Sequence, residues 1–324
     1  MRQQTPGTPA RFAAPTFAEA PLNVLITGGA GFIGSALTQA LRIAGHSVTP
    51  LDNLSVTSRR PSPTGLMVRD VRSLTAQDLG RVDTVVHLAA LKSVPESFEV
   101  GGFEHNVEVD RHMLHIFTDS TARRLLLASS CEVYGQQSGP LSENTPHAPR
   151  SPYAAGKVAT ELLADIYRPR LEDGRQLGIV RFFNTFGPHE DPDAVVPAFL
   201  DAVAENRPLT IEGDGTQARD LTYIEDAVTM LTRILDAPAL LPVVNCGSGH
   251  AVSISDLARA VIRTAGRGTI THTAPRINEI SSFTADQTLF ARMYGPIDRM
   301  PLDKALALSV QTRARTLAAA VPGR

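Results

Sequence analysis

Short apolar runs alternate with segments of helical periodicity through the first half of the chain. The apolar runs predict strands at 22–27, 46–53, 66–70, 82–90, 123–130 and 176–184. Apolar residues at helical spacing predict helices at 32–45, 103–120 and 151–171. Strands that alternate with helices in this way indicate an α/β fold, a Rossmann-like doubly wound parallel sheet.

The pattern changes after residue 184, where Pro and Gly become more frequent and the elements become shorter and mixed. We therefore expect a smaller, discontinuous C-terminal lobe that binds the substrate over the carboxyl edge of the sheet. The predicted division is a flexible tail over 1–20, a Rossmann domain over 21–184 with a returning segment at about 219–247, and a second lobe over 185–218 and 248–324. The segment 302–321 predicts a final helix.

Composition limits the class of protein and the partners. The chain has 324 residues, 43% of them hydrophobic, which is enough for one large or two modest domains. With 31 basic and 33 acidic residues, we expect neither nucleic acid nor a membrane as a partner. The cysteines, Cys131 and Cys246, form no C-x-x-C pair, which indicates a reducing, cytoplasmic location and no metal site.

A glycine-rich turn, "ITGGAGFIG", lies between the first predicted strand and the first predicted helix. Gly28, Gly31 and Gly34 are three residues apart. In a dinucleotide-binding turn the first glycine allows the tight turn, the second lets the backbone approach a pyrophosphate, and the third lets the helix pack against the strand. The phosphates then meet free N–H groups at the start of the helix. This context predicts a dinucleotide site.

The acid at the end of the second predicted strand indicates which dinucleotide is bound. Asp52 follows Gly28 by 24 residues, close to the expected spacing of about 20, and its carboxylate would accept a hydrogen bond from a ribose 2′-hydroxyl. Asp52 favours NAD over NADP, although Arg59 and Arg60 would suit a 2′-phosphate. Asp70 ends the third predicted strand and is either an adenine contact or a solvated strand end.

Tyr153 and Lys157, in "SPYAAGK", lie four residues apart and therefore on one face of the predicted helix. A lysine ammonium beside a tyrosine stabilises the phenolate and lowers the phenol's pKa from its usual value of about 10. The phenolate could then take a proton from a sugar hydroxyl as a hydride leaves for nicotinamide. Ser130 ends the preceding strand and could hydrogen-bond the same oxygen.

Seven motifs follow one another in an order that resembles the extended short-chain dehydrogenases/reductases that act on nucleotide sugars. They are "TGGAGFIG", "HLAALKSVPESF", "SSCEVYG", "SPYAAGK", "VRFFNTFGP", "VVPAFL" and "EGDGTQARDLTYIEDAV", and the resemblance runs from about Leu22 to about Asp286. It implies a bound NAD that is reduced and reoxidised in each turnover, and a UDP- or dTDP-hexose substrate. It also implies a catalytic triad of Ser130, Tyr153 and Lys157.

The resemblance also implies which residues contact the cofactor and the substrate. The cofactor contacts that it implies are Gly28, Gly31, Phe32, Ile33, Gly34, Asp52, Asn53, Asp70, Val71, Leu88, Ala89, Ala90, Lys92, Tyr153 and Lys157. The substrate contacts that it implies are Lys92, Ser130, Asn184, Val196, Arg219 and Arg276. The two arginines would clamp the diphosphate, whose oxygens match a guanidinium. The segment "EVGGFEHNV" departs from the family pattern, which puts Asn106 in doubt as a contact.

The residues that follow Ser130 separate the subfamilies. A 4-epimerase needs only the triad, whereas a 4,6-dehydratase resembles Thr-Asp-Glu at this point, with a carboxylate that removes the C5 proton and an acid that protonates the departing C6 hydroxyl. Here the base position is kept as Glu132, and the acid position holds Cys131. A thiol is mostly neutral at pH 7 and can donate a proton. Alternatively, Cys131 is a small buried apolar residue.

The Cys-Glu pair narrows the resemblance within the family. Together with "VRFFNTFGPHEDPDAVVP" and "PRINEI", it resembles the UDP-N-acetylglucosamine 5,6-dehydratase branch of tunicamycin biosynthesis. That implies loss of water across C5–C6 and return of hydride to C4, giving a 5,6-ene sugar nucleotide. A UDP-sugar 4-epimerase or a 4,6-dehydratase is the alternative, and a non-catalytic scaffold is disfavoured because Tyr153 and Lys157 are both present. The long helices at about 98–119 and 152–173 predict a homodimer.

Overall fold

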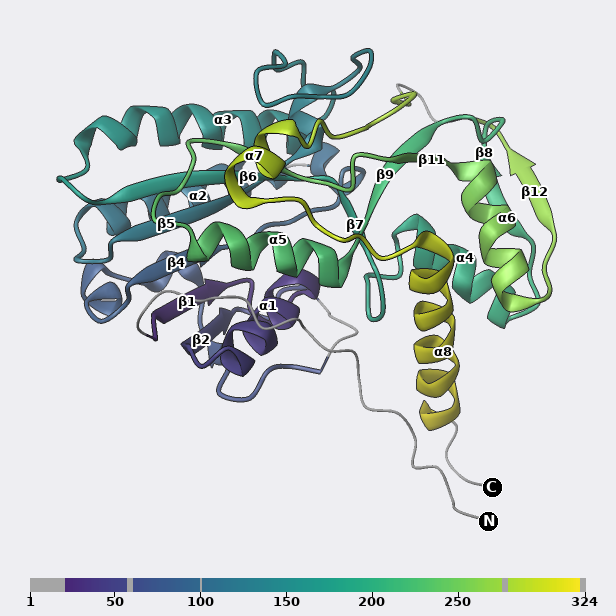
Figure 1. Ribbon diagram of the computed structural model, residues 1–324, viewed down its shortest axis with the longest axis horizontal. Coiled ribbons are helices and arrows are strands. Elements are labelled where there is room, and N and C mark those ends of the chain that lie inside the picture. The colour runs from purple at the N-terminus through teal and green to yellow at the C-terminus, as the bar shows by residue number, and fades with distance from the viewer. Residues whose placement is uncertain (1–20, 57–60, 100, 276–278, 321–324) are drawn as a thin grey trace.

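A computed structural model gives the structure of the protein and describes residues 21–56, 61–99, 101–275 and 279–320. Its largest sheet has seven parallel strands in the order β10-β6-β5-β4-β1-β2-β3 (Figure 1). The strands are β1 (Asn23–Thr27), β2 (Ser47–Asp52), β3 (Met67–Val68), β4 (Thr84–His87), β5 (Arg124–Ser130), β6 (Gln176–Phe182) and β10 (Val244–Cys246). The predicted α/β class with a doubly wound parallel sheet is confirmed.

Helices cover both faces of this sheet (Figure 1). On one face lie α1 (Phe32–Ile43) and α5 (Ile224–Asp236), and on the other lie α2 (Gly102–Thr118) and α3 (Pro152–Tyr167). Successive strand residues point to opposite faces. Ile26 therefore belongs to the same apolar cluster as Leu37 of α1, whereas Leu25 belongs to the cluster that contains Phe117 of α2.

The second half of the chain builds smaller units beside the sheet (Figure 1). Strands β7 (Asn184–Phe186), β9 (Ala218–Tyr223) and β11 (Ala251–Ser253) form a three-stranded sheet, and β8 (Leu209–Glu212) pairs with β12 (Ile270–Thr273). The remaining α-helices are α4 (Val195–Ala204), α6 (Ile254–Ala265), α7 (Thr288–Tyr294) and α8 (Leu302–Ala320). Short 3-10 helices span Val71–Ser73, Ala76–Leu79, Glu96–Phe98, Cys131–Tyr134 and Arg168–Arg170.

The segment that was expected to return to the first domain contains β9, α5 and β10. Helix α5 packs against α1, and β10 pairs with β6 at the edge of the seven-stranded sheet. The exact division into two lobes stays a prediction. The tail over 1–20 and the residues Arg59, Arg60 and Arg276 lie outside the described part of the chain.

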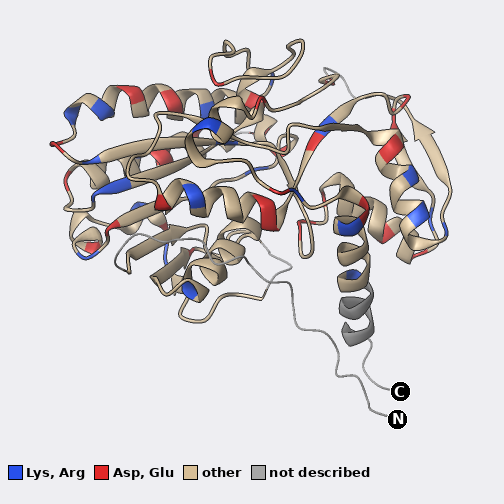
Figure 2. Ribbon diagram, viewed as in Figure 1, with Lys and Arg blue, Asp and Glu red and all other residues tan. Residues whose placement is uncertain are grey.

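Basic and acidic residues are interspersed along α3 and α6 (Figure 2). None of the helices in the described ranges combines the length and the apolar character that crossing a membrane requires.

Candidate active site

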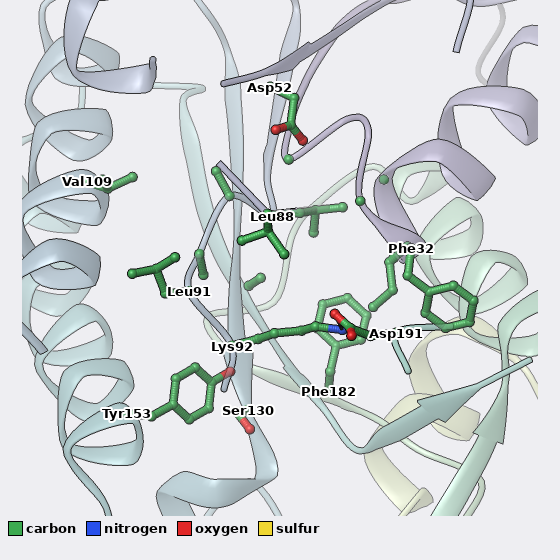
Figure 3. A pocket seen from close by; sticks show the side chains of 18 of the residues that line it. Phe32, Asp52, Leu88, Leu91, Lys92, Val109, Ser130, Tyr153, Phe182 and Asp191 are labelled. Atoms are coloured by element: carbon green, nitrogen blue, oxygen red, sulfur yellow. Dashed lines mark ion pairs between the residues drawn. The ribbon is translucent and has the colours of Figure 1, made fainter. Parts of the chain in front are cut away.

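A cavity of about 380 Å³ opens where the parallel strands β1, β4, β5 and β6 end. Tyr153 and Ser130 lie at one end of it, Asp52 at the other, and Lys92 with Asp191 between them (Figure 3). The carboxyl ends of parallel strands form one edge of a sheet, and ligands bind there where the strand order reverses, here between β1 and β4. The sequence-predicted residues that line the cavity are Gly28, Gly31, Phe32, Ile33, Gly34, Asp52, Asn53, Asp70, Val71, Leu88, Ala89, Ala90, Lys92, Ser130, Cys131, Glu132, Tyr153, Lys157 and Asn184.

The glycine turn has the geometry of a phosphate cradle. Gly28 has φ +67°, and a Cβ there would lie 2.8 Å from the backbone of Leu88 and Ala89. A Cβ on Gly34 would lie 2.1 Å from the Gly28 carbonyl oxygen, so only glycine lets α1 start this close to β1. Within the described part of the chain, no side chain caps the start of α1 at Gly31. The N–H groups of the first turn therefore stay available to an anion, as a bound pyrophosphate requires.

Asp52 holds the turn that follows β2. Its two carboxylate oxygens accept hydrogen bonds from the backbone N–H groups of Ala30, at 3.0 Å, and Leu54, at 2.8 Å. A carboxylate has further lone pairs, so it can still accept from the hydroxyls of a ribose. This arrangement fixes the Asp52 carboxylate beside the glycine turn and fits the ribose role that the sequence predicts.

Asp70 has local partners. Its carboxylate accepts from the Arg72 guanidinium at 2.8 Å and from the Asn53 amide at 3.3 Å. The hydrogen bond from Arg72 is the main cause of a pKa for Asp70 that lies well below its usual range. Asp70 therefore stabilises the start of the 3-10 helix Val71–Ser73, and its contact with an adenine stays a prediction.

The start of α3 positions the tyrosine. The Ser151 hydroxyl accepts from the backbone N–H of Ala154 at 3.1 Å, and Pro152 occupies the first turn, so Tyr153 lies immediately inside the helix. Its hydroxyl hydrogen-bonds with Ser130 at the end of β5. The pKa of Tyr153 is raised, not lowered as the sequence predicted, because burial raises it by more than the positive charge of Lys157 and the Ser130 hydrogen bond lower it.

Lys157 is buried, with 2% of its surface exposed. Its ammonium lies 3.2 Å from the carboxylate of Asp110 on α2. Burial is the largest single effect and lowers the pKa of Lys157, but the charge and hydrogen bond of Asp110, together with Tyr153 and Glu161, outweigh it and raise that pKa. Lys157 is therefore a fixed cation beside Tyr153.

Cys131 and Glu132 both line the cavity and open the 3-10 helix Cys131–Tyr134. Burial, reinforced by the negative charge of Glu132, raises the pKa of the Cys131 thiol well above its usual range. Burial also raises the pKa of Glu132, and the positive charge of Arg219 opposes that shift. The pair thus combines a neutral thiol with a carboxyl group whose pKa is shifted toward neutral pH, which suits a proton donor and a base.

Lys92 reaches the cavity from the loop after β4, and its ammonium lies 3.2 Å from the Asp191 carboxylate. The backbone of Leu91 is held by Asn106, whose side-chain oxygen accepts at 2.8 Å and whose amide donates at 2.8 Å. Asn106 therefore positions the loop that carries Lys92. Asn184, at the start of β7, also lines the cavity.

Two of the predicted substrate-binding residues, Val196 and Arg219, lie outside the lining of the cavity. Val196 is 1% exposed and belongs to the large apolar cluster. Arg219 forms an ion pair with Glu279, donates to the carbonyl oxygen of Ile280, and lies 5.6 Å above the ring of Phe283. Neither lines the cavity, so their substrate contacts stay predictions.

Several cavity or network residues were not foreseen, namely His87, Asp110, Glu190 and Asp191. Glu190 is 8% exposed, and one of its carboxylate oxygens has no hydrogen-bond partner among the residues that the structure describes. A signal existed for Asp110, because it shares the inward face of α2 with Phe103, Met113 and Phe117. A charged residue on an apolar helix face needs a partner.

A profile of the NAD-dependent epimerase/dehydratase family matches residues 24–247. The chain belongs to this family. The match contains the glycine turn, Asp52, Ser130, Tyr153 and Lys157. The residues around the cavity fit the family's cofactor, because the uncapped start of α1 and the close approach at Gly28 leave backbone N–H groups for its phosphates.

The relatives of this chain are named for different reactions. The NAD-dependent NDP-hexosamine 5,6-dehydratase TunA, involved in tunicamycin biosynthesis, is 39% identical with a TM-score of 0.86 over 91% of this chain and 98% of its own. An uncharacterized UDP-glucose epimerase, YtcB of Bacillus subtilis, is 31% identical over 82% of this chain and 89% of its own. A UDP-glucuronate 4-epimerase of Thermodesulfobacterium geofontis is 32% identical over 75% and 80%. Family membership therefore gives an NAD-dependent epimerase or dehydratase.

Proposed function

We propose that this epimerase/dehydratase is a nucleotide-sugar dehydratase that converts UDP-N-acetylglucosamine into a 5,6-ene sugar nucleotide. The pair Cys131 and Glu132 carries the proposal, because an epimerase needs no acid and base beyond the triad. Both side chains line the cavity that contains Tyr153 and Lys157. The likeness to TunA, a 5,6-dehydratase, supports the same choice.

The residues of the glycine turn and Asp52 would hold NAD, with its pyrophosphate at the start of α1 and a ribose at Asp52. Bound NAD supplies a hydride acceptor and donor. In the oxidation step, Tyr153 as phenolate takes the proton of the C4 hydroxyl, and Ser130 hydrogen-bonds the same oxygen. Lys157 supports the phenolate with its positive charge.

The elimination step uses the second pair of residues. Glu132 takes the C5 proton, which the C4 ketone makes acidic, and the electrons of that C–H bond form the C5–C6 double bond. The C6–O bond breaks, and Cys131 gives its proton to the departing hydroxyl, so one water leaves. Return of hydride to C4 and of the proton from Tyr153 restores the C4 hydroxyl.

A UDP-sugar 4-epimerase is the alternative, and two of the relatives are named as epimerases. A 4,6-dehydratase is the other alternative, in which hydride returns to C6 and the product is a 4-keto-6-deoxy sugar. We further propose that two chains form a homodimer. The outward residues Leu162 and Ile166 of α3, each 55% exposed, offer apolar surface for such a contact.

The test is incubation with UDP-N-acetylglucosamine in heavy water, followed by NMR and mass spectrometry. We expect loss of one water and vinyl signals at C6. A C4 epimer of unchanged mass would support the epimerase, and a C6 methyl group beside a C4 ketone would support the 4,6-dehydratase. Glu132→Gln should stop loss of the C5 proton, because an amide cannot act as the base. Full activity of that variant would refute the elimination mechanism.

A further inference from the structure

A chain of buried polar side chains lies behind Lys157. The Thr27 hydroxyl is 2.6 Å from Nδ1 of His87, and Nε2 of His87 is 3.1 Å from one carboxylate oxygen of Asp110. The other oxygen of Asp110 accepts from Lys157 at 3.2 Å and from the Thr160 hydroxyl. Each of these five residues is at most 2% exposed. The chain connects the end of β1 with the catalytic face of α3.

One arrangement of hydrogens satisfies every hydrogen bond of these five side chains. The Thr27 oxygen accepts from the backbone N–H of Ala89 at 3.3 Å, and its own hydrogen can be donated to Nδ1 of His87. A neutral His87 then has its hydrogen on Nε2 and donates it to Asp110. Burial disfavours a charged Asp110, but Lys157 and the hydrogen bonds from His87 and Thr160 lower its pKa to about 2. Asp110 is thus the anion and Lys157 the cation.

Asp110 is the anion that acts most strongly on Lys157. The other negative or ionisable groups that act on Lys157 are Tyr153 and Glu161. The Glu161 carboxylate is engaged by the Arg181 guanidinium at 2.6 Å and by the Ser129 hydroxyl at 2.5 Å. A lysine that is fully buried without a counter-ion can lose its proton near neutral pH. The charge of Lys157 therefore depends on Asp110.

We propose that Asp110 is a positioning residue for the oxidation step, which keeps Lys157 an ammonium ion beside Tyr153 and links it through His87 to Thr27. The inference rests on the roles given to Tyr153 and Lys157 in the proposed function. The sugar proton passes to the Tyr153 phenolate while Lys157 keeps its own proton. Thr27 directly precedes Gly28, so the same row of hydrogen-bonded side chains also stabilises the end of β1, from which the cofactor turn begins.

The experiment titrates Tyr153 directly and needs no sugar substrate. Tyrosinate absorbance is followed against pH in the NAD-loaded protein, and the signal of a Tyr153→Phe variant is subtracted to isolate Tyr153. In Asp110→Asn the buried Lys157 loses its counter-ion and its proton, so the phenolate loses its cation. We expect the Tyr153 titration to move to higher pH by about one unit or more. We also expect kcat with UDP-N-acetylglucosamine to fall at least about tenfold, with a smaller change in KM.

Thr160→Val is the matched control. It removes a hydrogen bond to the same Asp110 oxygen within the same buried cluster, but it leaves the charges in place. We expect it to lower the melting temperature without moving the Tyr153 titration. An equal shift in both variants would assign the effect to packing and overturn the role of the Asp110 charge.

The outcomes separate this inference from the proposed function. If Asp110→Asn leaves the Tyr153 titration unchanged, or moves it to lower pH, Lys157 keeps its proton without Asp110 and the inference fails. If Tyr153→Phe turns over UDP-N-acetylglucosamine at the native rate, the proposed function fails instead. The two results are independent, because the first needs only NAD.

Discussion

The ammonium of Lys92 and the carboxylate of Asp191 lie 3.2 Å apart and join two loops that follow different strands, β4 and β7 (Figure 3). Lys92 is half-exposed, so this ion pair contributes little to stability. A bound diphosphate would compete with Asp191 for the same ammonium. The pair is therefore expected to matter for ligand binding more than for folding.

Replacing Lys92 should weaken ligand binding, whereas replacing Asp191 should not. Lys92→Met should weaken binding of NAD or of UDP at least about threefold, because a cation near phosphate oxygens is lost. Asp191→Asn should leave affinity unchanged or increase it, because Lys92 no longer has a competing anion. Calorimetric titration with NAD and with UDP separately identifies which of the two Lys92 contacts. Equal weakening by both substitutions would show that the ion pair itself organises the site.

The glycine turn allows a folding role to be separated from a binding role. Gly34→Ala should destabilise the protein by about 3 kcal/mol, since its Cβ would lie 2.1 Å from the Gly28 carbonyl oxygen. Gly31 has φ −69° and a nearest contact of 3.1 Å, so Gly31→Ala should fold with a loss of only about 1 kcal/mol.

Gly31→Ala should nevertheless bind NAD at least about tenfold more weakly, because its methyl group enters the space into which the pyrophosphate must come. Thermal unfolding without ligand measures the first effect, and calorimetry with NAD measures the second. If a well-folded Gly31→Ala variant bound NAD with native affinity, the pyrophosphate would not bind at this turn.

Glu190 predicts a pH-dependent stability. Burial raises its pKa to about 8, and the positive charge of Lys92 and the hydrogen bond from Gly187 only partly oppose this rise. The unfolded chain ionises Glu190 near its ordinary value of 4.5, whereas the folded chain keeps it protonated up to about 8. Stability is therefore lost as pH rises between these values, by up to about 1.4 kcal/mol per pH unit.

Glu190→Gln removes this loss, because an amide keeps the shape of the neutral acid. The melting temperature of the variant should equal that of the native protein near pH 4.5 and exceed it increasingly up to about pH 8. Melting curves of both proteins across that range provide the measurement. Parallel curves would mean that Glu190 is ionised in the folded protein at neutral pH.

Much of the site was predictable because its functional residues lie at the ends of strands in an alternating pattern of strands and helices. Gly28, Asp52 and Ser130 each end a strand or follow one directly, and parallel strands bring their carboxyl ends to one edge. Tyr153 and Lys157 share a helix face by their spacing alone. Local sequence patterns were therefore enough to predict that the site lies at the carboxyl edge of the parallel sheet, and to predict these residues of it.

The partners of those residues were not predictable, because they depend on packing between distant segments. Asp110 meets Lys157 across the contact between α2 and α3, from 47 positions away in the sequence. Arg219 pairs with Glu279, 60 positions away. The periodicity of a single helix does not show which side chains it will contact on another helix. For the same reason, the sequence alone does not distinguish an arginine that binds phosphate from one, such as Arg219, that forms an ion pair within the protein.

Cys131 provides the last prediction, which concerns the proton donor of the elimination. The thiol is 3% exposed and lines the cavity, and burial together with the negative charges of Glu132 and Asp220 keeps its pKa well above the usual range. It therefore stays protonated at neutral pH and can give its proton to the departing C6 hydroxyl. A serine in its place is a much weaker acid.

Cys131→Ser should slow release of water by a factor on the order of ten to a hundred while leaving the earlier steps intact. If oxidation at C4 and removal of the C5 proton are intact, UDP-N-acetylglucosamine recovered from heavy water should contain deuterium at C5. The reason is that Glu132 still removes the C5 proton and then returns a deuteron. Cys131→Asp should recover part of the activity, since burial would keep a carboxyl group protonated there as well. Cys131→Ala is the control for packing. If the alanine and serine variants both release water at the native rate, Cys131 only fills space, and the departing hydroxyl receives its proton from another group.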